Sequence, residues 1–213
     1  MHATLPPKKT KKAAKAFWLK QLHTWHWVSS AICLIGLLLF TITGFTLNHA
    51  ADIEGQSQSA EVSVQLPPVL LSKLAEAAPQ SEKAVLPMPV AAWLEDNLPL
   101  RARGEAEWSD SEVYLPAPRP GGDAWVTIDR ESGAVVGEIS SRGTIAYLND
   151  LHKGRNSGTA WSWFIDIFAA ASLVFAITGL FLLQLHAAKR KSTWPLVALG
   201  LAIPAAIAII FIH

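Results

Sequence analysis

Histidine is the residue type in this chain with the widest scope for chemistry, because imidazole binds metals and changes charge near neutral pH. The 213-residue sequence has seven histidines, and all but the first fall at or near the ends of three long apolar runs. They are His2, His23, His26, His49, His152, His186 and His213. A histidine at such a boundary either rests at the membrane interface, as Trp and Tyr do, or acts as a ligand. The helix face on which each histidine lies distinguishes an interfacial residue from a ligand.

His26 shares a helix face with a stripe of small and polar residues. It lies 18 residues before Gly44, which is about five full turns of an α-helix. In another apolar run His186 follows Gly179 by seven residues, about two turns. Small and polar residues on a membrane helix face its neighbours. If the two helices are antiparallel, His26 and His186 lie at one depth and can ligate one haem iron from both sides.

A second pair of candidate haem ligands is His49, which closes the first apolar run, and His152, which precedes the second. Their geometry is weaker, because His49 is about 140° from Gly44 on an ideal helix. His152 lies in LHKGRNSG, a glycine-rich approach to a helix. Arg155 in that segment either pairs with a haem propionate or extends to the interface.

Two further residues in the apolar runs are candidates for function. His23, about one turn before His26, either supports that residue at the cofactor or stays at the interface, and no acid or cysteine lies near it to complete a zinc site. Asp166 is the one acid within a predicted span, and it is either functional or bonded to a neighbouring helix. The sequence has no GxSxG, HExxH or Walker motif. The net charge of +1 says nothing about partners, and we expect no nucleic-acid partner.

The elements that must position these residues are membrane helices. Hydrophobic residues make up 51% of the chain, and a helix of about 20 apolar residues crosses a bilayer. We expect transmembrane helices over 17–48, 158–188 and 195–213, after a basic tail at 1–16. The tail and the Lys189–Lys191 cluster are rich in lysine, so the positive-inside rule places both in the cytoplasm. We therefore expect a bacterial inner-membrane protein whose 50–157 domain and C-terminus are periplasmic.

The 50–157 segment reads as an α+β domain. EVSVQL and SEVYLPA alternate like strands, and DAWVTIDRESGAVVGEI reads as a hairpin with Gly133 at a positive φ. PPVLLSKLAEAA and PMPVAAWLEDNL favour short helices. The predicted fold class is thus a membrane α-helical protein with three transmembrane helices and a small extracytoplasmic α+β domain between the first two.

One apolar phrase occurs twice. FTITGFTLNH spans residues 40–49 and FAITGLFLLQLH spans 175–186, and each finishes on a histidine. Because the two predicted helices cross in opposite directions, the phrases form an inverted repeat. We predict that each phrase places its own terminal histidine, His49 or His186, at one face of the bilayer.

Several of these segments resemble the PepSY-associated transmembrane family. They are LHTWHW (22–27), both TG phrases, the hairpin AWVTIDRESGAVVGEI (124–139) and LNDLHKGR (148–155). The resemblance implies a PepSY-like outer domain and a link to haem proteins of ferric-siderophore reduction and iron uptake. Members of that family often have four or more spans, whereas this sequence predicts three.

We therefore expect a membrane b-type cytochrome carrying one or two haem b groups. It would pass electrons from a quinol or cytoplasmic flavin donor to a periplasmic acceptor, such as ferric-siderophore iron, and would act as a ferric reductase or an electron-transfer subunit of a larger one. His26 to His49 spans about 35 Å of helix, a long distance for one electron step. Either the haem edges close much of this gap, or a homodimer supplies intermediate centres, or the protein holds only one haem. The alternative is a haem-free PepSY accessory protein that binds a partner membrane enzyme.

Overall fold

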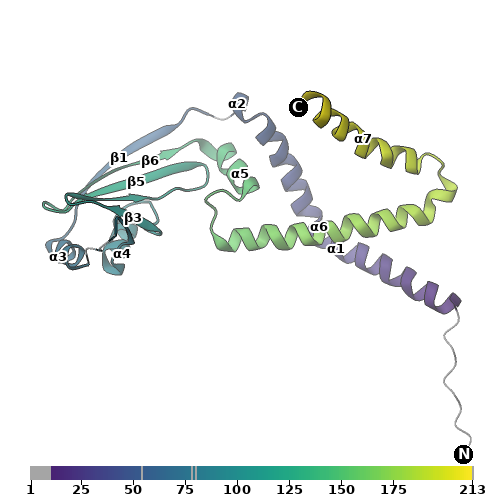
Figure 1. The fold of residues 1–213 in the computed structure, drawn as a ribbon, viewed down its shortest axis with the longest axis horizontal. Helices are drawn as coiled ribbons and strands as arrows, with labels where there is room; N and C mark the ends of the chain where they lie inside the picture. Colours follow the sequence, from purple (N-terminus) through teal and green to yellow (C-terminus); the bar gives the residue numbers. More distant parts are fainter. Residues whose placement is uncertain (1–10, 54, 78, 80, 213) are drawn as a thin grey trace, which may run out of the picture. The chain divides into compact units, whose positions relative to one another are not determined.

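The computed structural model describes residues 11–53, 55–77, 79 and 81–212 (Figure 1). In these ranges three helices are long and apolar enough to cross a membrane: α1 (Lys11–Asn48), α6 (Thr159–His186) and α7 (Thr193–Phe211). No described residue of α6 or α7 is buried within the chain. Exposed apolar surface of this extent is favourable in hydrocarbon and costly in water. The three helices therefore mark a membrane protein, as predicted.

The helix ends differ from those expected. Helix α1 begins at Lys11, six residues before position 17, so part of the predicted basic tail is helical. Its first residues, KKAAKAF, are mostly Lys and Ala, which favour helix. Positions 1–10 of the tail lie outside the described residues. Helix α6 is followed by a single 3₁₀ turn, η1 (Ala187–Lys189), and α7 begins two residues before position 195.

The chain divides into two compact units. One holds the chain through Leu38 together with Asp166–His213, and the other is Leu39–Ile165. Helices α1 and α6 each contribute to both units. The first unit contains the contact between the first part of α1 and the second part of α6. The second contains the end of α1, a sheet domain and the start of α6.

The sheet domain has six antiparallel strands in the order β1-β6-β5-β4-β3-β2. The strands are β1 (Gln58–Gln65), β2 (Lys83–Val85), β3 (Glu105–Trp108), β4 (Glu112–Pro116), β5 (Gly122–Asp129) and β6 (Ala134–Ser141). Four short helices accompany it: α2 (Ala50–Ile53), α3 (Pro68–Glu76), α4 (Met88–Asn97) and α5 (Gly143–Lys153). Figure 1 shows α3 and α4 on one side of the sheet. This is the predicted small α+β domain between the first two membrane helices.

Periodicity predicts most of the regular elements of this domain and misses β2, β3 and α5, as well as the single turn of α2. Strands β1, β4, β5 and β6 and helices α3 and α4 fall where the sequence predicts them. Strands β2 and β3 are only three and four residues long, too short to show an alternating pattern. Helix α5 has an apolar face interrupted by the buried polar residues Asn149 and Asp150. The sequence pattern predicts no element at these positions, and the helix proves central to the candidate site.

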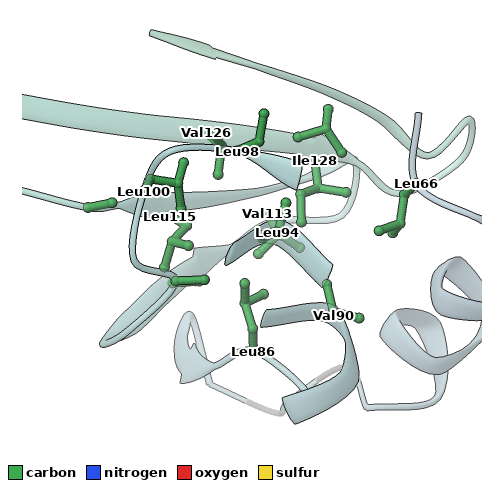
Figure 2. Close-up of a cluster of buried hydrophobic side chains, with 14 of the residues drawn as sticks. Leu66, Leu86, Val90, Leu94, Leu98, Leu100, Val113, Leu115, Val126 and Ile128 are labelled. Atoms are coloured by element: carbon green, nitrogen blue, oxygen red, sulfur yellow. The ribbon is translucent and has the colours of Figure 1, made fainter. Parts of the chain in front are cut away.

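One face of the sheet carries the core (Figure 2). Alternate residues of β4 and β5, including Val113, Leu115, Val126 and Ile128, are buried, as a half-buried strand requires. Val90 and Leu94 of α4 are buried against them, and Leu66 closes one end. Burying one such side chain stabilises the fold by about 1.5–3 kcal/mol. The domain thus has its own core, independent of the membrane helices.

The β5–β6 hairpin turns as the sequence predicts. Gly133 has a φ of 74°, where a side chain would be strained. Asp129 fixes the turn, because its Oδ1 accepts hydrogen bonds from the backbone N–H groups of Ser132 (2.7 Å) and Glu131 (3.1 Å) and from the Ser132 hydroxyl (2.7 Å). The hydrogen bonds from Ser132, and then that from Glu131, lower the pKa of Asp129.

The sign of this pKa shift predicts an acid-sensitive turn. A lowered folded pKa means that the carboxylate stabilises the turn above the unfolded value of about 3.9, and that this stabilisation is lost as the pH falls through the folded pKa. In wild-type protein, acidification should therefore speed hydrogen exchange of the Ser132 and Gly133 amides beyond the intrinsic rate change. In Asp129→Asn the same two amides should exchange faster than in wild type at pH 7, and their exchange rate should change less on acidification.

The control is Glu131→Gln in the same turn, which should exchange like wild type. Equal protection of wild type and Asp129→Asn at pH 7 would contradict this role.

Candidate functional site

His26 of α1 is held by three residues of α6. Its Nδ1 lies 3.0 Å from Thr178 Oγ1 and 3.3 Å from the carbonyl oxygen of Phe175. Its ring stacks on the Phe175 ring, with centroids 4.8 Å apart and an interplanar angle of 18°. Gly179 lies beside the ring, and a Cβ there would lie 3.4 Å from His26 Cε1, at van der Waals contact. The imidazole therefore packs against this glycine.

These contacts assign the tautomer of His26. The Thr178 hydroxyl donates to the carbonyl of Val174 (2.7 Å) or of Phe175 (3.0 Å), so toward His26 it acts as acceptor. The Phe175 carbonyl can only accept. Nδ1 must therefore carry the proton and donate it. The lone pair is then on Nε2, which has no hydrogen-bond partner within the described part of the chain. A neutral imidazole in this state is ready to bind a metal or accept a proton.

His152 of α5 is held by α1 in the same way. Its Nδ1 lies 2.7 Å from Thr43 Oγ1, and Thr43 itself donates to the carbonyl of Leu39 at 2.8 Å. The Phe40 ring lies with its centroid 5.0 Å from that of His152, and a Cβ on Gly44 would lie 3.4 Å from His152 Cε1. Again Nδ1 donates to the threonine, and the lone pair remains on Nε2.

The repeated phrase is thus a binding surface for a histidine from another helix. We call it the histidine seat: Phe, Thr and Gly at positions i, i+3 and i+4, which share one helix face. The seats are Phe40–Thr43–Gly44 and Phe175–Thr178–Gly179. The sequence pattern predicts that each phrase positions the histidine at its own end, which is five residues beyond Gly44 or seven beyond Gly179. In the structure each seat instead receives a histidine from a different helix.

Helix α5 brings His152 to its seat because Asp150 fixes the helix to the sheet domain. Asp150 is 1% exposed and accepts hydrogen bonds from Arg142 Nη2 (2.7 Å) and the backbone N–H of Gly121 (2.9 Å). Its Oδ1 lies 3.5 Å from Lys153 Nζ. The helix ends at Gly154, whose φ is 68°. The sequence pattern did not indicate a role for Asp150. The one feature that could have done so is that this acid lies in LNDLHKGR, a segment that resembles the family.

Asn149 adds a second bond between α5 and α1. It is completely buried, and its Oδ1 accepts a hydrogen bond from Thr46 Oγ1 at 2.7 Å. Thr46 is three residues beyond Thr43 on α1, and these two threonines bind Asn149 and His152 of α5. A buried amide and a half-buried imidazole are thereby both satisfied, as a low-dielectric setting requires.

His26 and His186 line one groove of about 760 Å³ in the first unit. Roughly 300–1,000 Å³ is usual for cofactor pockets. The groove is otherwise lined by apolar residues of α6 and by two cations: Phe175, Ala176, Gly179, Leu180, Leu182, Leu183, Lys189 and Arg190. His186 is exposed, and its Nδ1 donates to the carbonyl of Leu182 at 2.8 Å. Both histidines therefore present Nε2 as the basic nitrogen in a mostly apolar setting.

The structure does not bring the second predicted pair together. His49 follows the last residue of α1, and its Nδ1 donates to the Phe45 carbonyl (3.0 Å) while its ring packs on the Phe45 ring at 4.5 Å. His152 sits at a different position, on the Phe40–Thr43–Gly44 seat. Within the described ranges no contact joins the two histidines. The weak wheel geometry of His49 agrees with this arrangement.

The remaining candidates lie outside the groove. His23 is exposed, and its Nδ1 donates to Leu19 O at 2.8 Å. Arg155 is exposed, and its backbone N–H closes α5 by donating to the Asp150 carbonyl at 2.8 Å. Asp166 is exposed on α6. His2 and His213 lie outside the described residues. Among the described residues, no three His, Cys, Asp or Glu gather in a group that could hold a metal ion.

The buried carboxylate predicts how α5 responds to mutation. Asp150→Ala removes the buried carboxylate that accepts from Arg142 Nη2 and from the Gly121 amide, and breaking a buried charge pair typically costs about 3–5 kcal/mol. Native-state hydrogen exchange of α5 should report a fall in its opening free energy of about that size. The matched control is Asp96→Ala on the exposed side of α4, which should leave α5 protection unchanged. Unaltered protection in Asp150→Ala would show that the helix is held by other contacts.

The sequence and its structure were compared with known proteins. No curated protein and no solved structure matches the chain. A family model described as PepSY_TM-like matches residues 17–213, which include the three membrane helices, the sheet domain and both histidine seats. This match covers most of the chain, and the protein therefore belongs to the PepSY_TM-like family.

Proposed function

We propose that this protein is a membrane b-type cytochrome in which His26 of α1 and His186 of α6 are the axial haem ligands. A haem b bound there would supply one-electron transfer. The observation that carries the proposal is the groove they line together, which combines two imidazoles, an apolar wall and two cations. Axial histidine ligation in an apolar pocket is one of the main ways in which a protein sets the behaviour of haem iron.

The residues of the groove have distinct roles in this proposal. Thr178 and the Leu182 carbonyl hold the Nδ1–H groups of His26 and His186, so that each ligand keeps its Nε2 lone pair and a fixed ring orientation. Lys189 and Arg190 would pair with the two propionate carboxylates. The leucine and phenylalanine side chains of α6 would exclude water from the macrocycle.

The basic clusters support a direction for the electron path. Lys189, Arg190 and the lysines at the start of α1 favour the cytoplasmic side for this end of the helices. The sheet domain then lies in the periplasm of a bacterial inner membrane. Electrons would enter from a quinol or a cytoplasmic flavin and leave toward a periplasmic acceptor. The family resemblance supports ferric iron in a siderophore as that acceptor.

A second haem would need ligands of its own, the first of them within the Leu39–Ile165 unit. His152, seated on Thr43 with its Nε2 lone pair uncommitted, is the candidate ligand for a second haem. His49 is not its described neighbour, so the second axial ligand would come from elsewhere, for instance from a second copy in a homodimer.

Absorption spectroscopy tests the proposal. Protein purified in detergent from haem-replete cells should show a Soret band, with sharp α-bands on reduction. His26→Ala and His186→Ala should each remove most of the same signal, because each deletes one axial ligand. His23→Ala is the matched control, since His23 is one turn away, exposed and outside the groove, and its spectrum should equal that of wild type. A colourless wild-type protein would end the cytochrome interpretation.

Thr178 offers a finer test of the same site. Thr178→Ala removes the acceptor of the His26 Nδ1–H, and loss of a ligand's hydrogen-bond partner typically weakens metal binding about 10–100-fold. We expect weaker haem retention and a shifted midpoint potential in redox titration, and Thr178→Ser should restore both by keeping the hydroxyl. If the serine variant behaves like the alanine variant, the methyl group's packing rather than the hydrogen bond is what matters.

The second candidate is a haem-free accessory protein that binds a membrane enzyme. One observation favours it: both seated histidines are half-buried and already make a hydrogen bond across a helix contact. Interhelical polar contacts of this kind hold membrane helices together without any cofactor. Under this alternative His26→Ala loosens the α1–α6 contact, while the purified wild type carries no haem.

A further inference from the structure

A large cleft of the sheet domain plays no part in the proposed haem site. It encloses about 1240 Å³, and all of its lining residues belong to the Leu39–Ile165 unit. The residues that give it chemical character are Glu95, Arg101, Arg103, Arg119, Tyr147 and Trp161. Its volume is above the roughly 300–1,000 Å³ typical of small-molecule pockets. It therefore has room for an organic molecule, not only for a simple ion.

The lining carries an excess of positive charge. Three arginines face one glutamate, which leaves a net charge of two (3 − 1). Glu95 is engaged by Arg103, with Oε1 3.6 Å from Nε, and by the backbone N–H of Ala102 at 3.1 Å. The negative charge of Glu95 is therefore offset by Arg103, which leaves Arg101 and Arg119 as the source of the excess positive charge.

The other two arginines have no carboxylate partner. Arg101 makes no side-chain hydrogen bond or ion pair to any described residue. Arg119 donates from Nη2 to the Ser140 carbonyl at 2.8 Å, and it too lacks an acidic partner within the described part of the chain. Two guanidinium groups lining one cleft, each with donors to spare, suit a ligand with more than one negative group, because the planar fork binds carboxylate or phosphate in bidentate fashion.

The remaining walls of the cleft are aromatic and rigid. The Trp161 indole is held by a hydrogen bond from Nε1 to the Leu151 carbonyl at 2.8 Å. Tyr147 lines the cleft on α5, with its backbone close to Gly121, where a Cβ would lie 2.6 Å from Tyr147 Cα. Three prolines, Pro99, Pro118 and Pro120, also line it, and their fixed φ angles limit movement of the loops. These walls can contact the body of a ligand whose charges the arginines bind.

We infer that this cleft binds an organic polyanion, with negative groups on Arg101 and Arg119 and an apolar or aromatic body against Tyr147 and Trp161. Carboxylates and phosphates share the chemistry that the two arginines recognise. The inference concerns binding alone and does not depend on haem. The polyanion site and the haem site can therefore be disproved independently of each other.

Isothermal titration calorimetry on the full-length protein in neutral detergent tests the inference. Three probes separate the contribution of the arginines from that of the aromatic walls. Phthalate has two carboxylates on an aromatic ring, and citrate has three on an aliphatic chain. Pyrophosphate has negative charge without an organic body. We expect phthalate and citrate to bind, phthalate more tightly, and pyrophosphate to bind weakly. Binding should weaken with added salt, because the attraction is electrostatic. His26→Ala should bind the probes like wild type.

Arg101→Ala should weaken phthalate binding about tenfold or more, since a hydrogen bond to a charged group is lost. Arg101 has no structural bond, so the variant should fold, and Arg101→Lys should recover part of the affinity. Arg119→Lys should also weaken binding. Lys73→Ala, which removes one exposed positive charge from α3 away from the cleft, is the matched control and should change affinity less than twofold.

Three results would overturn the inference. The first is no binding of phthalate or citrate by wild type at millimolar concentrations. The second is an equal loss of affinity in Arg101→Ala and Lys73→Ala, which would reduce the effect to general charge. The third is binding of pyrophosphate alone, which would remove the role of the aromatic walls.

Discussion

This structure depends on one kind of contact between helices. A histidine ring packs against a glycine of a neighbouring helix, and its Nδ1–H donates a hydrogen bond to the threonine that precedes this glycine. This contact occurs twice. Helix α1 takes part in both, because it presents His26 to α6 and offers Phe40–Thr43–Gly44 to His152 of α5. Each seat uses three residues. The imidazole packs against the glycine, the threonine hydroxyl accepts a hydrogen bond from the Nδ1–H, and the phenylalanine ring packs against the imidazole.

Hydrocarbon explains why this contact takes so regular a form. A polar group inside a membrane must be satisfied by the protein, since no water is present. The threonine can accept from histidine because its own hydroxyl donates to a carbonyl one turn earlier on the same helix. The chain of bonds from imidazole to threonine to backbone leaves no donor unmatched, and it fixes the tautomer. Nε2 then remains as the only basic atom of each seated ring.

Helix α5 couples the sheet domain to the end of α1. Asp150 ties it to Arg142 and to the Gly121 amide, while Asn149 and His152 tie it to Thr46 and Thr43. The same helix lines the arginine-rich cleft through Tyr147 and Leu151. A ligand in the cleft would thus touch the helix that carries a seated histidine. The buried polar pair makes α5 costly to displace, which suits an element that must keep both contacts in register.

The sequence by itself determined the architecture of this protein, because that architecture follows from composition and periodicity. Three apolar runs predict three membrane helices. The hairpin with Gly133 and the alternation of β4 and β5 predict much of the sheet. Strands β2 and β3 are too short to carry a period, and the polar residues of α5 hide its helical pattern. The helical wheel also placed His26 and His186 on faces shared with glycine, from spacing alone.

Only the tertiary structure decided which histidine belongs to which phrase. Spacing relates residues on one helix, so it paired FTITG with His49 and FAITG with His186. The partner of a helix face lies on another element, and its register depends on how the two pack, which no single-helix pattern contains. The structure instead seats His152 on the first phrase and His26 on the second. His49 and His186 each donate from Nδ1 to a carbonyl one turn earlier on their own helix. His186 also lines a groove together with His26.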